Sequence, residues 1–280
     1  MRIQWAFVII PLSLSRAIPV TTPTVCSTTP CPKAGAAYTD PSLVGPLSIT
    51  GSVRWAYDWD MFTRGPLPPS VEFVPMLHGP KMFSGWSKAI NLALANGAKY
   101  ILGFNEPDDS SQANLSPSTA ASYYKVYISP LFNKATLVSP AVTNGEGTNQ
   151  GLNWMNSFLS CCTDCNIGVV AVHWYGETAK EFKDFVLRAI QLAKQHNIQH
   201  IWVTEFALNS DMNGGDSSGS AAFLSEVIPW LNAQNAVSRY AYFMCADGFL
   251  LNGRSLNAAG QAYTTPYVEG KRDVIWNRTV

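Results

Sequence analysis

Residues 167–204 read IGVVAVHWYGETAKEFKDFVLRAIQLAKQHNIQHIWVT, and this stretch decides the fold. An apolar run at 167–173 is followed by a helical segment at 180–196 and by a second apolar run at 200–204. Both runs are apolar almost without interruption, which is typical of strands buried on both faces of a parallel sheet. A strand, a helix and a strand in this order indicate an α/β fold.

The same alternation extends over most of the chain. Further apolar runs lie at 52–59, 72–77, 100–105, 136–139 and 239–244, and further helical segments at 86–96, 119–134, 151–160 and 220–234. No Gly-x-Gly-x-x-Gly motif follows the first strand, so the repeat favours a (β/α)8 TIM barrel, built as a single domain, over a doubly wound sheet. Seven runs are convincing strands, whereas a barrel needs eight. We expect the missing strand to be very short or to lie near residues 43–49.

The composition excludes two broad classes of protein. Nineteen basic residues balance nineteen acidic ones, and only 14% of the 280 positions are charged. A protein that follows nucleic-acid phosphates needs a basic surface, so nucleic acid is not expected as a partner. A hydrophobic content of 47% excludes a disordered chain. Nine tryptophans in a weakly charged chain favour flat apolar ligands, carbohydrates among them.

The first residues predict export. Arg2 precedes a mostly apolar stretch at 3–14 and a small-x-small cleavage site at 15–17, as in a secretory signal peptide. No later run resembles a membrane helix, so no membrane association is expected. The expected divisions of the chain are a signal peptide at 1–17, a Thr/Pro/Ser-rich arm at 18–45, the folded domain at 46–268 and a C-terminal tail at 269–280.

An exported chain is exposed to oxidation and glycosylation. The six cysteines favour disulfide bonds, because the Cys161-Cys162-x-x-Cys165 cluster lacks a second group of ligands that would complete a zinc site. The sequence does not choose among the possible pairings. Asn114 and Asn277 begin Asn-x-Ser/Thr acceptor sequences for N-linked glycans.

Candidate functional residues lie where the predicted strands end. In a (β/α)8 barrel the active site forms at the carboxyl ends of the strands. Two glutamates stand out because each closes an apolar run: Glu106 in the sequence Gly-Phe-Asn-Glu-Pro-Asp at 103–108, and Glu205 in Val-Thr-Glu-Phe-Ala at 203–207. Burying an unpaired carboxylate is costly, so two of them facing one mouth of a barrel need a reason.

Cleavage of a glycosidic bond needs two such carboxyl groups. One donates a proton to the leaving oxygen, and the other stays ionised to attack or to activate water. In the structural alternative, each glutamate pairs with Arg54 or a lysine, or caps the following helix. That alternative suits one glutamate better than two that are separated by two strands and flanked by Asn and aromatic residues. The remaining acidic residues do not cluster in the sequence, so neither a metal nor another cofactor is expected.

Three motifs together resemble one enzyme family. The sequence at 103–108, His-Trp-Tyr at 173–175 and Thr-Glu-Phe at 204–206 resemble the secreted fungal glycoside hydrolase family 128. These enzymes are endo-β-1,3-glucanases related to the alkali-sensitive-linkage cell-wall proteins. The resemblance implies that Glu106 on strand four is the acid/base and Glu205 on strand seven the nucleophile of a retaining mechanism. Two predicted strands lie between them, and the missing strand then belongs among the first three.

The resemblance also implies residues that contact the sugar. Asn105 would hydrogen-bond the 2-hydroxyl, and Tyr175 or His173 would orient Glu205 and keep it ionised. The predicted substrate-binding residues are Asn105, His173, Tyr175, Trp174, Trp59 and Tyr57. Two alternatives stay open for the tryptophans. Trp59 either stacks on sugar or fills the barrel, and Trp174 alternates with His173 along one strand, so both cannot point inward unless the strand end twists.

The sequence therefore predicts a secreted glycoside hydrolase that cleaves internal β-1,3-glucosidic bonds in the fungal cell wall or the extracellular space. The expected partner is β-1,3-glucan polysaccharide or oligosaccharide, and the expected form is a monomer without a cofactor. Two alternatives remain. One is a β-glucan-binding wall protein that cleaves slowly or not at all, and the other is a different barrel glycosidase such as a β-mannanase.

Overall fold

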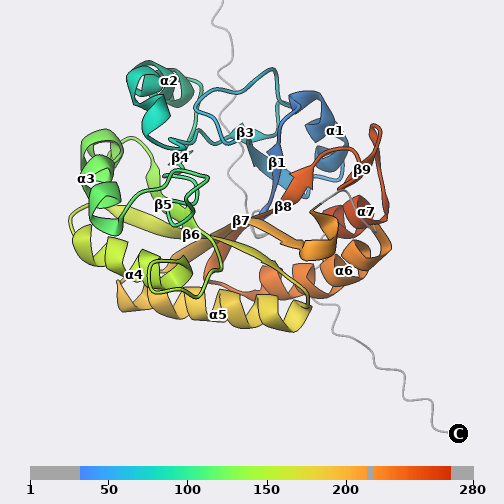
Figure 1. The fold of residues 1–280 in the computed structure, drawn as a ribbon. Helices are drawn as coiled ribbons and strands as arrows, with labels where there is room; N and C mark the ends of the chain where they lie inside the picture. The colour runs from blue at the N-terminus through green and yellow to red at the C-terminus, as the bar shows by residue number, and fades with distance from the viewer. Residues whose placement is uncertain (1–31, 213–216, 266–280) are drawn as a thin grey trace, which may run out of the picture. The chain divides into compact units, whose positions relative to one another are not determined.

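The computed structural model describes residues 32–212 and 217–265. Eight parallel strands form one sheet in the order β3-β2-β1-β8-β7-β6-β5-β4 (Figure 1). The strands are β1 (Ala34–Tyr38), β2 (Val53–Tyr57), β3 (Glu72–Phe73), β4 (Tyr100–Ile101), β5 (Thr136–Val142), β6 (Ile167–Gly176), β7 (His200–Leu208) and β8 (Val237–Cys245).

Backbone hydrogen bonds close this sheet into a barrel between β3 and β4. The Leu77 nitrogen donates to the Leu102 carbonyl at 3.1 Å, and the Leu102 nitrogen donates to the Pro75 carbonyl at 2.9 Å. The seam lies just beyond the two shortest strands of the barrel, where the chain continues in an extended path. The predicted (β/α)8 single-domain fold is confirmed.

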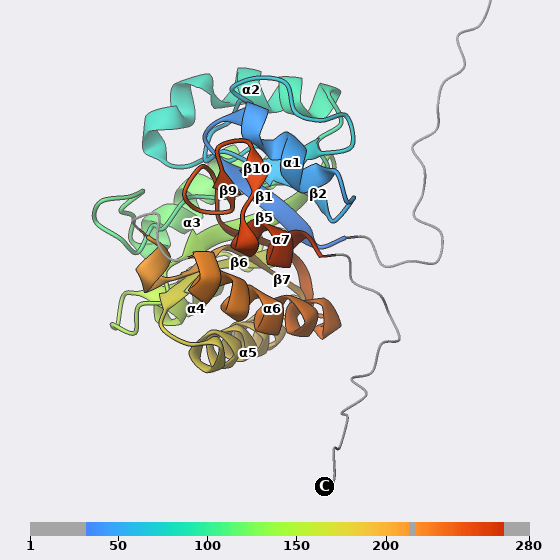
Figure 2. The ribbon, with the colours of Figure 1, turned by 90° about the vertical axis from the view of Figure 1, so that its right-hand side faces the viewer.

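Helices surround the strands on the outside (Figures 1 and 2). The α-helices are α1 (Val44–Ser48), α2 (Phe83–Ala95), α3 (Pro117–Tyr127), α4 (Gly151–Cys161), α5 (Ala179–Gln195), α6 (Ser217–Ala233) and α7 (Ala258–Thr264), with short 3-10 turns at Pro41–Leu43, Pro80–Met82, Ser129–Leu131 and Asn209–Asp211. A hairpin of β9 (Leu251–Asn252) and β10 (Ser255–Leu256) lies beside α1 and α7 (Figure 2).

Helix α5 shows how local sequence fixes these elements. The Thr178 hydroxyl accepts from the Glu181 nitrogen at 3.2 Å, and the Glu181 carboxylate accepts from the Thr178 nitrogen at 3.1 Å. This reciprocal capping box satisfies backbone donors that would otherwise lack partners at the start of the helix. The buried face of α5 that packs on the sheet consists of Phe182, Phe185, Val186, Ala189, Ile190, Leu192 and Ala193.

The missing strand lies earlier in the chain than the sequence predicts. It is β1, which falls inside the segment 18–45 that was expected to be a mobile arm, whereas residues 44–48 form helix α1. The arm prediction is therefore wrong for residues 34–45, and the expectation of a strand near 43–49 is wrong as well. The predicted signal peptide at 1–17 and the tail at 269–280 lie outside the described residues.

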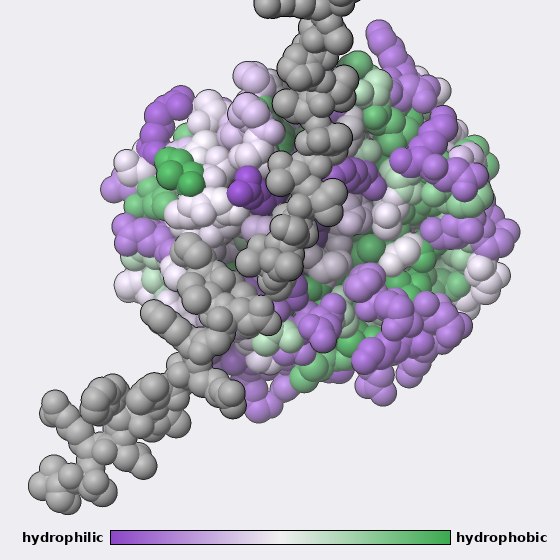
Figure 3. Space-filling view, turned by 180° about the vertical axis from the view of Figure 1, so that it is seen from behind, coloured by the Kyte–Doolittle hydropathy of each residue, from purple (hydrophilic) through white to green (hydrophobic). Residues whose placement is uncertain are grey.

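Two apolar cores result from this architecture. The larger one lies between the strands and the helices. The smaller one fills the barrel interior, where Trp55, Tyr57 and Trp202 are completely buried among aliphatic side chains. On the outer surface polar side chains alternate with small apolar areas (Figure 3). The exposed large apolar residues are spread over different elements: Ile49, Phe62, Leu92, Val126, Phe132, Leu187 and Met212.

One disulfide bond forms within the described residues, between Cys162 and Cys165. Cys161 is an exposed free thiol and Cys245 a buried one, and burial raises the pKa of Cys245 to about 12. Cys26 and Cys31 lie outside the described residues. Among the helices at 32–212 and 217–265, none is long and apolar enough to cross a membrane.

Candidate active site

Glu106 and Glu205 lie at the carboxyl ends of β4 and β7, with β5 and β6 between them. The Glu106 nitrogen donates to the Ala141 carbonyl of β5 at 2.8 Å, and Glu106 has a φ of +40°. Non-glycine residues rarely adopt this conformation, which costs about 1–3 kcal/mol and is often found at functional sites. Glu205 pairs in register with His173 of β6, directly after a register shift that follows Val172.

The His173 imidazole stands between the two carboxylates. Its Nδ1 lies 2.8 Å from Oε1 of Glu106, and its Nε2 lies 3.5 Å from Oε1 of Glu205. The ring is completely buried. The Nδ1 contact is a hydrogen bond, whereas the buried Nε2 has no hydrogen-bond partner among the described residues. His173 thus shares a proton with Glu106 and lies next to Glu205, with little access to water.

Two further donors hold Glu205. The Trp59 indole nitrogen donates to Oε1 at 2.6 Å, and the Tyr175 hydroxyl donates to Oε2 at 2.5 Å. Because each carboxylate oxygen accepts one hydrogen bond, the Glu205 side chain is fixed in orientation.

The charges of the two glutamates govern the neighbouring pKa values. Burial alone would lower the pKa of His173, but the carboxylates of Glu205 and Glu106 outweigh it and raise that pKa above its usual value. Burial and the Glu205 charge raise the pKa of Tyr175 far above that of a free tyrosine, so Tyr175 stays a neutral donor. The cluster therefore retains protons at a pH where an isolated histidine loses its own.

Trp59 reaches Glu205 from the end of β2. Trp55, Tyr57 and Trp59 all point into the barrel, with ring centroids 5.9 Å apart for the first pair and 5.2 Å for the second. Trp59 has a φ of +58°, the second left-handed non-glycine conformation among the residues that contact the carboxylate cluster.

Sequence reasoning missed one aromatic side chain at the site. Phe243, from β8, is partly exposed and packs edge-on against Trp59 and Tyr175 at centroid distances of 5.9 and 5.7 Å, and against Phe249 at 5.9 Å. These four rings, called here the aromatic wall, flank the carboxylates. The sequence offered a weak signal, because Phe243 lies near the end of the apolar run at 239–244.

Two neighbours of Glu106 hold the surrounding loops. The Asn105 amide nitrogen donates to Oε1 of Gln112 at 3.3 Å, and its buried amide oxygen has no partner among the described residues. Asp108 accepts from the Thr143 nitrogen and hydroxyl and from the Gly151 nitrogen at 2.8 Å, so it ties the loop after β4 to the loop after β5. The motif at 103–108 thus contains the buried amide of Asn105, the catalytic candidate Glu106, and Asp108, which joins two loops.

Three of the predicted substrate-binding residues do not reach the cleft. Trp174 points to the outside of the barrel and packs between Phe182 and Phe223, since it alternates with His173 along β6. Tyr57 is completely buried, and its hydroxyl donates to the Thr204 carbonyl at 2.8 Å. His173 is also completely buried and contacts the glutamates. Burial therefore argues against sugar contact for all three. Asn105 is only 3% exposed and is buried as well, so among the predicted substrate-binding residues only Tyr175 and Trp59 are partly exposed.

Among the described residues, one group of possible metal ligands is found, namely Glu106, His173 and Glu205, each offering one atom within 4.8 Å of the others. The two glutamates face different nitrogens of the imidazole. The ring therefore bridges the carboxylates and does not converge with both of them on one central ion. This arrangement fits proton transfer better than metal coordination.

The chain matches the family described as glycosyl hydrolase catalytic core over residues 35–263. It is 30% identical over 201 residues to alkali-sensitive linkage protein 1 of Schizosaccharomyces pombe, a match that covers 70% of this chain and 35% of that protein. The chain thus spans about a third of the length of this curated relative.

Two solved structures share the fold. One is the curdlan-specific exo-β-1,3-glucanase of Blastomyces gilchristii, a family 128 enzyme in complex with glucose, with 39% identity, a TM-score of 0.79, and coverage of 85% of this chain and 100% of that one. The other is an endo-β-1,3-glucanase of the same family from Amycolatopsis mediterranei, a glutamate-to-alanine variant in complex with laminaripentaose. It has 26% identity and a TM-score of 0.69, and the match covers 83% of this chain and 98% of that one.

The match of the family model over most of the chain agrees with the paired carboxylates in the barrel mouth. The predicted resemblance to glycoside hydrolase family 128 is confirmed. The chain belongs to the glycosyl hydrolase catalytic core family and is a glycoside hydrolase.

Proposed function

We propose that this glycoside hydrolase cleaves β-1,3-glucan with retention of configuration, with Glu205 as nucleophile and Glu106 as acid/base. One observation carries the proposal: carboxylate oxygens of the two glutamates lie within 4.8 Å of each other. Retaining glycosidases hold their two carboxyl groups about 5–5.5 Å apart, whereas inverting ones need roughly 6.5–9.5 Å to admit a water molecule.

The hydrogen bonds around each glutamate suit its role. Glu205 accepts from Trp59 and Tyr175, which hold its carboxylate in one orientation for attack. The hydrogen bond of Glu106 is to Nδ1 of His173. The proton shared by Glu106 and His173 goes to the leaving glycosidic oxygen as Glu205 attacks the anomeric carbon. Glu106 then takes a proton from the water that releases the sugar from Glu205.

The substrate is proposed from the relatives. The Blastomyces and Amycolatopsis enzymes are β-1,3-glucanases, and the second was crystallised with a laminari-oligosaccharide. The aromatic wall offers this chain apolar faces on which a glucosyl ring can stack.

The sequence predicts cleavage of internal bonds, and this remains our proposal for the mode of action. The relative from Blastomyces, at 39% identity, is exo-acting, whereas the one from Amycolatopsis, at 26%, is endo-acting. Product sizes early in the reaction separate the two modes, because internal cleavage releases mixed oligosaccharides and end-directed cleavage releases one short product. We also propose that the chain is exported and acts as a monomer at the cell wall or outside the cell.

The decisive experiment measures oligosaccharide release from linear β-1,3-glucan by wild type, Glu106→Gln and Glu205→Gln. We expect release by wild type only, with glucan binding retained in both variants. Anomeric NMR of the first product should show the β-anomer. A wild type that binds β-1,3-glucan but releases no oligosaccharide would establish the wall-binding alternative. Activity on mannan alone would overturn the proposal that β-1,3-glucan is the substrate.

A further inference from the structure

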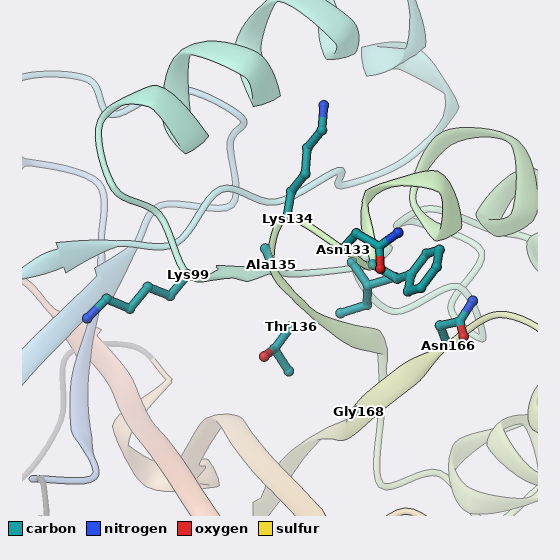
Figure 4. A pocket seen from close by; sticks show the side chains of 9 residues that line it. Lys99, Asn133, Lys134, Ala135, Thr136, Asn166 and Gly168 are labelled. Atoms are coloured by element: carbon teal, nitrogen blue, oxygen red, sulfur yellow. The ribbon is translucent and has the colours of Figure 1, made fainter.

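A shallow depression of about 520 Å³ lies at the other end of the barrel (Figure 4). Lys99 precedes β4, Thr136 begins β5, and Asn166 and Gly168 lie at the start of β6, so the depression opens at the amino ends of these strands. Glu106 follows the opposite end of β4. The depression is therefore separate from the carboxylate cluster and takes no part in the chemistry described above.

Its lining combines one exposed aromatic ring with neutral polar groups. Phe132, which follows the 3-10 turn at Ser129–Leu131, leaves 49% of its surface exposed. Asn133, Thr136 and Asn166 contribute amides and a hydroxyl, groups that both donate and accept hydrogen bonds. A sugar ring presents an apolar face and a rim of hydroxyls, so it matches a flat ring bordered by such groups.

The charged residues of the lining do not form an anion site. Lys99 and Lys134 point in different directions, so their ammonium groups do not converge, whereas Asn133 and Asn166 lie on the same side of the depression (Figure 4). Among the described residues, no carboxylate lines the depression, so nothing in its lining favours a cationic ligand. The chemistry left is that of a neutral, hydroxyl-rich ligand.

Local backbone features keep the depression open. A β-carbon at Gly168 would lie 3.0 Å from the Thr136 methyl carbon, so a larger residue there would crowd the floor. Asn166 has a φ of +58°, which its short polar side chain tolerates. The loop before Asn166 is held by the Cys162–Cys165 disulfide and by a hydrogen bond of 3.1 Å from the Ser129 hydroxyl to the Cys165 carbonyl.

We propose that this depression is a second glucan-binding site, which holds a polymer chain while the distant carboxylates cleave it. The inference rests on the proposed function, because it takes its ligand from the proposed substrate. A second contact on the same polymer raises the local concentration of cleavable bonds around the active site. The benefit is large for an insoluble glucan particle and absent for a short soluble oligosaccharide, which does not occupy both ends of the barrel at once.

The test compares Phe132→Ala with a matched control, Leu187→Ala, whose side chain is 48% exposed on α5. Initial rates are measured on dilute insoluble β-1,3-glucan particles and on soluble laminarihexaose. We expect Phe132→Ala to lower the ratio of the insoluble to the soluble rate at least threefold, and Leu187→Ala to leave that ratio unchanged. An unchanged ratio in Phe132→Ala, with an unchanged Tm, overturns the inference.

Calorimetry separates this inference from the proposed function, because binding needs no turnover. In a Glu205→Gln background we expect two laminarihexaose sites per chain, and one after Phe132→Ala or Asn133→Ala is added. A single site in every variant overturns the second site. If wild type cleaves no β-1,3-glucan and the added substitutions still remove one of two sites, the proposed function fails and the glucan-binding site stands. If the depression binds inorganic phosphate but not laminarihexaose, the inference that its ligand is a neutral sugar is overturned.

Discussion

The barrel holds a charged cluster at each of its two ends, and the two clusters are built differently. At the amino ends of the strands, Arg239 forms an ion pair of 2.7 Å with Glu72. Its guanidinium carbon lies 4.2 Å from the Tyr100 ring centroid, 4.8 Å from that of Trp202 and 5.4 Å from that of Trp55. At the carboxyl ends, two glutamates share one histidine.

The contrast lies in charge balance and backbone strain. The Arg239 cluster pairs one cation with one anion and adds three aromatic faces, which stabilise a cation. The Glu106–His173–Glu205 cluster holds two acids against one base, and left-handed backbone occurs at Glu106 and at Trp59, which contacts Glu205. The first arrangement stabilises the fold, whereas the second keeps a proton and an ionised carboxylate available at a cost in stability.

The largest expected effect distinguishes the two acids of the catalytic end. Glu205→Gln should lower kcat at least ~10⁴-fold on glucan and on a dinitrophenyl β-laminaribioside, because both substrates need the nucleophile. Glu106→Gln should lose ~10³-fold in kcat/KM on glucan but only about tenfold in kcat/KM on the aryl glycoside, because formation of the glycosyl-enzyme from that substrate needs no proton donor. Steady-state kinetics on both substrates checks this. Equal losses on the aryl glycoside would contradict the assigned roles.

A substitution at the opposite end should affect stability alone. Arg239→Met keeps the apolar contacts with the rings but leaves Glu72 without its partner, so unfolding free energy should fall by about 3 kcal/mol. Denaturant melts measure the loss, and kcat per folded molecule serves as the control. Adding Glu72→Gln should restore part of the stability. A drop in kcat of the folded variant would show that the two ends are coupled.

The histidine of the catalytic end should control pH dependence. His173→Asn should lower kcat/KM ~10²-fold, since it removes the partner that shares a proton with Glu106. In wild type the raised pKa of His173 retains that proton above the usual histidine range. A carboxyl alone ordinarily loses its proton at lower pH than an imidazole, so the alkaline limb of the pH profile should move to lower pH in the variant. An alkaline limb that stays in place would assign His173 a structural role only.

The smallest expected effect concerns a third carboxylate at the same end. Asp58 directly follows β2, is completely buried, and has a pKa that burial raises to about 6. The unfolded chain ionises this group near its ordinary pKa, whereas the folded chain resists ionisation. Stability should therefore fall by about 2 kcal/mol between pH 4.5 and 7.5 because of this residue. The difference in unfolding free energy between wild type and Asp58→Asn should change by that amount over this pH range. A pH-independent difference would contradict the prediction.

The sequence was sufficient where burial leaves a simple pattern. Runs of apolar residues located the long strands, and Glu106 and Glu205 stood out because each interrupts such a run at its end. Strand β1 was missed because it consists of small residues in a Thr/Pro-rich neighbourhood. The structure shows why they are small, since a β-carbon at Gly35 would lie 2.2 Å from the Trp55 indole.

Side-chain direction was the part that sequence could not supply. The register shift between β6 and β7 lies in β7, where Thr204 is the extra residue between Val203, which pairs with Val172, and Glu205, which pairs with His173. No residue type marks such a shift, and it brings Glu205 beside His173, whereas regular alternation along β6 points His173 inward and Trp174 out of the barrel. Likewise, alternation correctly put Tyr57 on the same face as Trp59, but the depth of each residue in the barrel decides which of the two meets solvent.

The join between the first strand and the last part of the barrel affects how the chain folds during synthesis. The Lys33 ammonium donates to carbonyls at the end of α6, including that of Gln234, 201 residues later, and β1 pairs with β8. A ribosome adds about 5–20 residues per second, so one edge of β1 waits some 10–40 s for its partner. Until β8 emerges, the nascent barrel is an open sheet with a free edge. A pause in translation of the final fifth of the message should therefore expose that edge to other chains and favour aggregation.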